Sequence, residues 1–221
     1  MKKLFSFFIA IILAYGLNSC NLNNSEGPNE LGGSTNIPLA QVGNTFSLSA
    51  KVAGQQVDLN DTMEITKNEG GLQTIKVKAT VPDDPKLQQY ASYLPAFVFD
   101  SPGHINTEFK IKMTSEGIQD FFNKDQKAHT LVKYDCKVGD KYQLTKSNGV
   151  TITRTVTAKS DKDDFPYAFW NIKTVTVEQD SRIPGVKKIV YRANHKFGLV
   201  WVSFEMEDGT SNSSYIFTTN Y

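Results

Sequence analysis

Asp100, Ser101 and His104 lie within five residues of one another and are the three residue types of a hydrolytic triad. In such a triad the histidine takes the proton of the serine hydroxyl while the carboxylate orients the histidine, and the three side chains come from separate elements that converge in space. Here they surround a Pro102-Gly103 pair, which is typical of a type II turn. We therefore expect a turn between strands at this point and no catalytic residue.

The other candidate metal and cofactor motifs are incomplete. Neither His104 nor His195 has a second histidine at helical spacing or a cysteine pair beside it, so a site built from these two alone has little support. The acidic run 161–164 resembles the start of a calcium loop, but Pro166 and Ile172 stand where that loop needs glycine and glutamate. The sequence also has no phosphate-cradling glycine loop and no dinucleotide-binding fingerprint. We expect no metal and no cofactor.

Aromatic side chains form the most promising binding feature. Phe165, Tyr167, Phe169 and Trp170 lie within six residues, after the acidic run and at the entrance of a predicted strand. Exposed aromatic rings stack on sugars or contact a protein partner. The alternative is a plug that covers one open end of a β core. Trp201 is a further candidate if its face of a later strand is open to solvent.

These observations favour a non-enzymatic binding or structural module whose ligand is a glycan, a lipid or a protein. The alternative is a secreted hydrolase whose site residues are scattered along the chain. An enzyme should show a cleft with convergent polar groups and shifted pKa values, whereas a binding module should show an apolar or aromatic surface.

The N-terminus carries an export signal. Lys2 and Lys3 precede an apolar run over 4–17, which is shorter than the roughly 20 residues of a membrane-spanning helix. A basic start, a short apolar run and small residues after it are typical of a secretory signal peptide. We assign residues 1–19 to this signal.

The segment Leu17-Asn18-Ser19-Cys20 resembles the lipobox that lipoprotein signal peptidase recognises, with Asn18 as its least typical residue. The resemblance extends more loosely to the lipoproteins of Bacteroidota-type bacteria. It implies that Cys20 is lipidated, that the membrane is a partner through this anchor, and that the protein resides at the outer membrane. The sequence leaves open whether the body faces the periplasm or the cell surface. A second resemblance, of Asp61-Thr62-Met63 to the O-glycosylation sites of secreted Bacteroidota proteins, implies a glycan on Thr62.

Composition separates a tether from a body. Residues 21–36 are mostly Asn, Ser, Gly, Pro and Glu, which cannot bury enough apolar surface to offset the loss of chain entropy. This predicts a flexible tether over 20–40 and a body over 41–221. Without Lys2 and Lys3 the chain has 22 basic and 23 acidic residues and no basic patch, so nucleic acid is not an expected partner. Cys136 is then the only other cysteine, either buried in a strand or a reactive thiol.

The body is predicted to be mainly β, as an antiparallel β-sandwich or a strongly curved sheet. Apolar and polar residues alternate with period two. Gly70-Gly71, Asn148-Gly149 and Asp208-Gly209 are hairpin-turn dipeptides between such runs. Two short helices are expected, one from Asp84 to Leu94 and one from Ser115 to Phe122. Strands are predicted near 45–51, 62–67, 75–81, 95–100, 108–114, 131–136, 141–146, 150–158, 171–178, 187–193, 199–206 and 213–219.

A faint internal repeat divides the body into candidate halves 41–136 and 137–221. Residues 42–49 resemble 138–145, with Gly43 matched to Gly139. Two looser matches follow in order, of 96–104 with 189–195 and of 113–117 with 206–209. If these matches reflect a duplication, Gly43 and Gly139 should begin equivalent strands.

Cys20→Ala should release the protein from the membrane fraction and abolish its labelling by fatty acid. Two or three acyl chains give lasting attachment, whereas a chain without them has no anchor. Fractionation of cells grown with a labelled fatty acid measures both effects, with Cys136→Ala as the control that keeps its label. Unchanged labelling of the Cys20→Ala variant would contradict the assignment.

Overall fold

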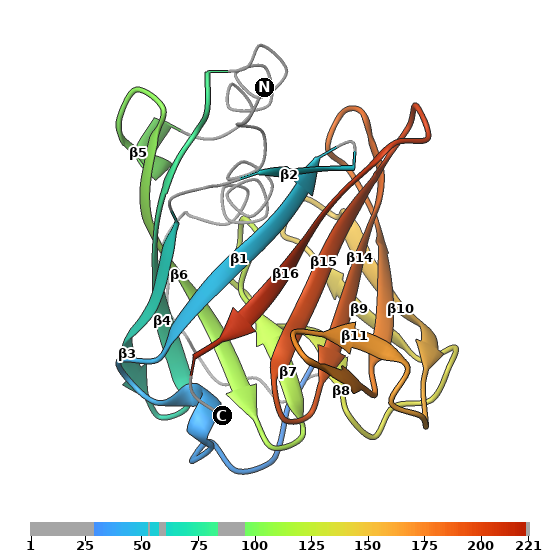
Figure 1. Cartoon of the computed structure of the whole chain (residues 1–221). Coiled ribbons are helices and arrows are strands. Elements are labelled where there is room, and N and C mark those ends of the chain that lie inside the picture. Colours follow the sequence, from blue (N-terminus) through green and yellow to red (C-terminus); the bar gives the residue numbers. More distant parts are fainter. Residues whose placement is uncertain (1–28, 53, 58–60, 84–95, 220–221) are drawn as a thin grey trace.

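The structure is a computed structural model that describes residues 29–52, 54–57, 61–83 and 96–219 (Figure 1). Within these ranges the chain is almost entirely strands and turns, and the only helical elements described are the 3₁₀ turns η1 (Pro38–Ala40) and η2 (Ala96–Val98). The strands are β1 (Thr45–Val52), β2 (Gln55–Val57), β3 (Thr62–Glu69), β4 (Leu72–Thr80), β5 (Phe99–Ser101), β6 (His104–Thr114), β7 (Gly117–Asp120), β8 (His129–Lys133), β9 (Lys141–Thr145), β10 (Thr151–Lys159), β11 (Phe165–Tyr167), β12 (Trp170–Ile172), β13 (Val175–Asp180), β14 (Val186–Asn194), β15 (Gly198–Met206) and β16 (Ser211–Thr218).

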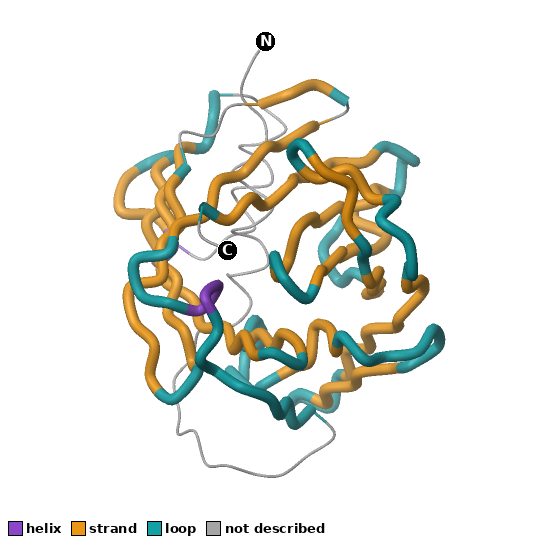
Figure 2. The backbone as a smooth tube through the Cα atoms, turned by 60° about the horizontal axis from the view of Figure 1, so that its bottom comes forward, coloured by secondary structure: helices purple, strands orange, loops and turns teal. Residues whose placement is uncertain are grey.

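One antiparallel sheet winds back on itself and almost closes (Figure 2). Its strands follow the order β8-β7-β6-β4-β3-β1-β16-β15-β14-β13-β10-β9, while β2 and β5 pair at the side of β1 and β6. Because β1 pairs with β16, the first and last described strands meet in the middle of the sheet. The edge strands β8 and β9 then face each other across a seam.

The prediction of a mainly β body is confirmed, in the form of a strongly curved sheet and not of a sandwich. Period-two alternation gives each strand one face for the interior, as in β4, where Ile75, Val77 and Ala79 are buried. The predicted hairpin turns are also formed, since Gly71, Gly149 and Gly209 all have positive φ between paired strands. A sandwich would need two facing sheets, but β11 and β12 are the only described strands outside the main sheet.

The helix predicted for 115–122 is wrong, because residues 117–120 form β7, paired with β6 on one side and β8 on the other. The spacing of Ile118, Phe121 and Phe122 suits a helix, but ladder pairing on both edges overrides this local preference. Gly117 also lies so close to the Val132 carbonyl that a Cβ at this position would collide with it. The helix predicted for 84–94 lies outside the described residues.

The tether predicted for 20–40 ends earlier than composition indicated. From Asn29 onward the chain packs on the sheet: Leu31 and Leu39 are buried, and the backbone N–H of Ser115 donates to the Ser34 carbonyl at 2.9 Å. Two leucines in this segment are enough because each finds an apolar or close-packed site: Leu39 joins the interior core, and Leu31 lies against Gly117 of β7. Residues 20–28 lie outside the described residues.

Gly43 and Gly139 begin strands with the same local geometry. Both have positive φ, of 88° and 97°. The Gly43 N–H donates to the Ile65 carbonyl at 2.8 Å, and the Ile65 N–H donates to the Asn44 carbonyl at 2.9 Å. In the same way, the Gly139 N–H donates to the Val156 carbonyl at 2.8 Å, and the Val156 N–H donates to the Asp140 carbonyl at 2.9 Å. A register shift follows directly after Ile65 in β3 and after Val156 in β10.

The two downstream matches of the repeat do not occupy equivalent places. They align β6 with β15. Counted from β1, the neighbouring strands run β1-β3-β4-β6, so β6 is the fourth. Counted from β9, they run β9-β10-β13-β14-β15, so β15 is the fifth. Because all neighbours are antiparallel, β6 runs opposite to β1 whereas β15 runs in the direction of β9. The duplication of the two halves stays a prediction, supported by the first match and not by the other two.

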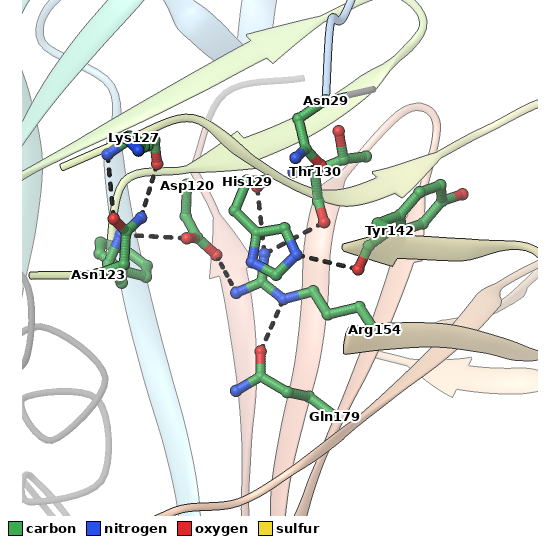
Figure 3. Close-up of polar contacts among 10 residues, drawn as sticks. Asn29, Asp120, Asn123, Lys127, His129, Thr130, Tyr142, Arg154 and Gln179 are labelled. Atoms are coloured by element: carbon green, nitrogen blue, oxygen red, sulfur yellow. Dashed lines mark hydrogen bonds and ion pairs between the residues drawn. The ribbon is translucent and has the colours of Figure 1, made fainter. Parts of the chain in front are cut away.

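Arg154 of β10 is buried in the interior and connects the strands on both sides of the seam (Figure 3). Its Nη2 lies 2.6 Å from Asp120 Oδ2 of β7, its Nη1 donates to the His129 and Thr130 carbonyls of β8 at 3.2 Å each, and its Nε donates to Gln179 at 2.8 Å. Burial raises the pKa of the Asp120 carboxyl, while the Arg154 charge opposes that rise. A buried carboxylate of this kind depends on its cation.

His129 and Asn29 bridge the same seam. His129 Nε2 lies 3.1 Å from the Tyr142 carbonyl of β9. Asn29 donates to the Gln143 carbonyl of β9 at 2.7 Å and accepts the Thr130 N–H of β8 at 3.3 Å. One side-chain amide thus takes the place of backbone pairing between the two edge strands.

His129 should make the fold acid-sensitive, because burial first and the nearby Arg154 charge second lower its pKa from 6.5 to about 3. At a pH between these two pKa values, His129 is protonated in the unfolded chain but neutral in the folded protein. The free energy of unfolding should therefore fall by up to about 1.4 kcal/mol per pH unit as the pH drops through this window. Urea unfolding between pH 7 and pH 4 should show a shallower dependence for His129→Gln. The exposed His104→Gln is the control, and an equal slope in all three proteins would contradict the assignment.

Candidate functional site

The strands β11 and β12 form a hairpin that lies against the outer face of the main sheet (Figure 1). We call residues 165–172 the aromatic hairpin. Its base packs into a second apolar cluster, separate from the interior core. The members of that cluster are Phe165, Tyr167, Ile172, Phe197 and Val200, with the partly buried Trp201, Tyr215 and Phe217 packed on it.

Two of the predicted ligand-binding aromatics, Phe165 and Tyr167, are buried on the side of the hairpin that faces the main sheet. Phe165 stacks on Tyr215, with ring centroids 5.7 Å apart. Tyr167 lies 5.1 Å from both Phe197 and Phe217, and its hydroxyl donates to the Ile216 carbonyl at 2.8 Å. These side chains hold the hairpin on the sheet, so for them the covering role fits better than ligand binding.

Trp201 is partly covered as well. The Arg192 guanidinium lies 5.2 Å from its ring and 4.7 Å from the ring of Phe165. A cation over two aromatic faces favours a fixed arrangement of the three side chains. Trp201 therefore supports the base of the hairpin more than it offers a binding face.

The other two aromatics are more exposed: Phe169 lies in solvent, whereas Trp170 keeps contact with the ring of Phe197. Phe169 is 96% exposed and Trp170 is 50% exposed, and we call this pair the aromatic tip. Ala168 and Phe169 form the two-residue turn between the paired residues Tyr167 and Trp170. Ala168 has φ of +51°, a conformation that costs a residue with a Cβ about 1–2 kcal/mol. Strain of this kind is concentrated at functional sites.

The turn between β14 and β15 borders the tip. Asn194 fixes this turn: its side-chain amide donates to the Lys173 carbonyl at 2.7 Å, and its Oδ1 accepts the N–H of Lys196 at 2.8 Å and of Phe197 at 3.2 Å. Phe197 stacks on Trp170 with centroids 6.5 Å apart and planes inclined by 14°, and Lys196 Nζ lies 5.2 Å from the Phe197 ring centre. A basic side chain is thus placed beside the tip.

A cavity of about 70 Å³ lies inside the sheet and is lined by apolar side chains. A closed sheet with more than about eight strands has more interior than its side chains fill, so some space is expected there. The lining residues are Leu39, Phe46, Met63, Ile75, Phe109, Ile111, Met113, Phe122, Leu131, Tyr191, Leu199, Val202 and Ile216. They belong to the same interior core that holds the fold together.

A polar hollow of about 350 Å³ surrounds the turn at Gly103. Gly103 has φ of +75°, as the predicted turn requires. The Ser101 hydroxyl lies 3.2 Å from Asp100 and not against His104, and Asn106 donates to the other oxygen of Asp100 at 2.9 Å. This last bond is the main reason that the pKa of Asp100 is lowered. In a hydrolytic triad the serine bonds to the histidine, so the contact of Ser101 with Asp100 is not the one that a triad requires.

The remaining predicted sites are placed as follows. Thr62 begins β3 with its side chain exposed, and Cys20 lies outside the described residues. Cys136 is buried just after β8, and burial raises the pKa of its thiol.

In the described part of the chain no group of three or more His, Cys, Asp or Glu side chains could hold a metal ion. Nor does this part contain a helix long and apolar enough to span a membrane.

Sequence reasoning missed the buried pair of Asp120 and Arg154. The signal for Arg154 was present, because alternation over 150–158 places it on the same face as Ile152 and Val156. A charge on an inward face needs a buried partner. Asp120 carried no such signal, since its segment was expected to be helical.

No protein-family model matches the chain, and no curated protein matches it. Among solved structures, a crystal structure from Bacteroides fragilis, described as a candidate exported protein with a YmcC-like fold, is similar with a TM-score of 0.46 and 9% identity. The similarity covers 81% of this chain and 96% of that chain. A likeness this distant carries no argument about function.

Ala168→Gly should raise the free energy of unfolding by about 1 kcal/mol, because glycine adopts positive φ without the steric cost of a Cβ. Ala158→Gly is the matched control, at an exposed position of β10, and should lower stability by about 0.5–1 kcal/mol. Chemical unfolding of both variants measures the difference. A loss of stability for Ala168→Gly would show that the turn is not strained.

Proposed function

We propose that this protein is a lipid-anchored protein of the outer membrane whose β body is a non-enzymatic binding module, with the aromatic tip as its binding site. The lipobox residues at 17–20 support the anchor. The observation that carries the binding role is the exposure of Phe169 and Trp170 on a strained turn. Single exposed apolar residues are common on proteins, but two neighbouring exposed aromatic rings on a packed hairpin form a patch of the kind that marks a binding surface.

The buried base makes this site rigid before any partner arrives. Phe165 and Tyr167 are packed on the main sheet, and the Tyr167 hydroxyl is also hydrogen-bonded to it, so the tip loses little conformational freedom on binding. Aromatic side chains with few rotatable bonds are frequent binding hot spots for the same reason. The partner classes consistent with this chemistry are a glycan, a lipid surface and a protein.

A hydrolase has less support. Among the described residues, the acid and the imidazole with the clearest burial-driven pKa shifts are Asp120 and His129, and both are buried in the seam with their bonds directed to Arg154 and to backbone groups. A catalytic acid or base must reach a substrate, and these two face the inside of the sheet.

Phe169→Ser should weaken binding of the responsive ligand at least about tenfold, a loss of about 1.4 kcal/mol that is usual for a hot-spot aromatic. Binding is followed by the fluorescence of Trp170 in a Trp201→Phe background, with glycans, phospholipid vesicles and envelope proteins as separate probe sets. Phe97→Ser, at another exposed phenylalanine, is the matched control and should bind as the parent does. If no probe set changes the Trp170 signal, the proposed binding site is wrong.

A further inference from the structure

We infer that the aromatic tip inserts into the surface of a phospholipid bilayer, where it forms a second, non-covalent contact of the body with the membrane. This inference rests on the proposed function and names the partner of its binding site. The arguments are the chemistry of the tip, the separation of charge along the hairpin, and the length of chain between the anchor and the body.

The tip has the chemistry of a membrane interface. Phe169, which is 96% exposed, leads the hairpin and offers a fully apolar ring. Trp170 follows with half of its surface exposed, and tryptophan prefers the headgroup level because its ring is apolar with one polar N–H. Lys196 contacts the ring of Phe197, on which Trp170 stacks, and a lysine can bury its stem while its ammonium stays among lipid phosphates.

Charge is divided along the hairpin in the direction that this orientation needs. Asp161, Asp163 and Asp164 precede Phe165 and therefore lie at the base, where Phe165 pairs with Ile172; with Lys162 and Lys173 at the same end, the base has a net charge of −1. The turn at Ala168 is the opposite end of the same hairpin, and the exposed charged side chain placed there by the turn at 194–197 is Lys196. Anionic headgroups would attract the tip and repel the base, so the hairpin would enter by its tip.

The chain length to the anchor keeps the tip within reach of a bilayer. Asn29, the first residue packed on the body, comes nine residues after Cys20. Nine residues span at most about 30 Å. A body held this close experiences a high effective concentration of lipid surface, so a weak contact by two aromatic rings is enough to set its orientation.

The test is the depth of Trp170 in vesicles. The full-length mature protein, in a Trp201→Phe background, is reconstituted into vesicles of phosphatidylcholine with a minor fraction of phosphatidylglycerol. Half of the samples contain phosphatidylcholine brominated on its acyl chains, which quenches tryptophan only at membrane depth. We expect strong quenching of Trp170 together with a blue shift of its emission. Phe169→Ser should reduce the quenching at least twofold, and Lys196→Glu should reduce it in anionic vesicles but not in purely zwitterionic ones.

Phe97→Ser is the matched control and should leave the quenching unchanged. The inference is overturned if Trp170 remains fully accessible to an aqueous quencher, or if Phe169→Ser is quenched like the parent. If Trp170 responds instead to a glycan or a protein probe, the bilayer is the wrong partner while the binding site stands. If it responds to no probe, the proposed function fails as well. Absence of fatty-acid label on Cys20 would remove the anchor, and quenching at raised vesicle concentration would still decide the insertion.

Discussion

The seam between β8 and β9 is the constraint on which the rest of the structure depends. Apart from the short side strands β2 and β5, every other strand of the main sheet has backbone partners on both sides, but these two edges face each other without a ladder. Arg154 satisfies two carbonyls of β8, and Asn29 bonds to one group on each edge. Because the Arg154 charge is buried, Asp120 must accompany it, and removing either partner would leave the other charge unpaired in the interior. The polar contacts therefore specify one way of closing the sheet.

This constraint explains a difference between the two strand starts that share a local geometry. The cross-strand pair after Gly43 is Phe46 with Met63, and both side chains line the apolar cavity. The corresponding pair after Gly139 is Tyr142 with Arg154, and both take part in the seam. β1 closes against β16 through a backbone ladder and needs no polar side chains, whereas β9 has no such partner and depends on them. One backbone arrangement thus carries an apolar pair in one place and a polar pair in the other.

The seam also holds the first described residue of the chain. Asn29 bonds to Thr130 and Gln143, so the segment that it begins is part of the closure. Away from the seam, on β15 and β16, the aromatic hairpin uses Phe165 and Tyr167 for attachment and leaves Phe169 in solvent and Trp170 half exposed. With the proposed anchor at Cys20 and the proposed insertion of the aromatic tip, the body would have two points that set its orientation at a membrane.

The sequence alone determined the features that are local along the chain. The proposed lipobox is a linear segment that needs no fold to be recognised. Alternation over 75–81 and 108–114 places side chains on one face or the other, and Gly-containing dipeptides end strands because only glycine adopts positive φ without strain. Only the tertiary structure decided that residues 117–120 are a strand and that a polar segment packs from Asn29 onward. It also decided which aromatics of 165–170 are buried. The reason is physical: alternation encodes the face of a residue but not what lies opposite that face. Phe165 and Phe169 are chemically alike, and only the position of β16 and β15 beneath the hairpin gives one of them a partner and leaves the other in water.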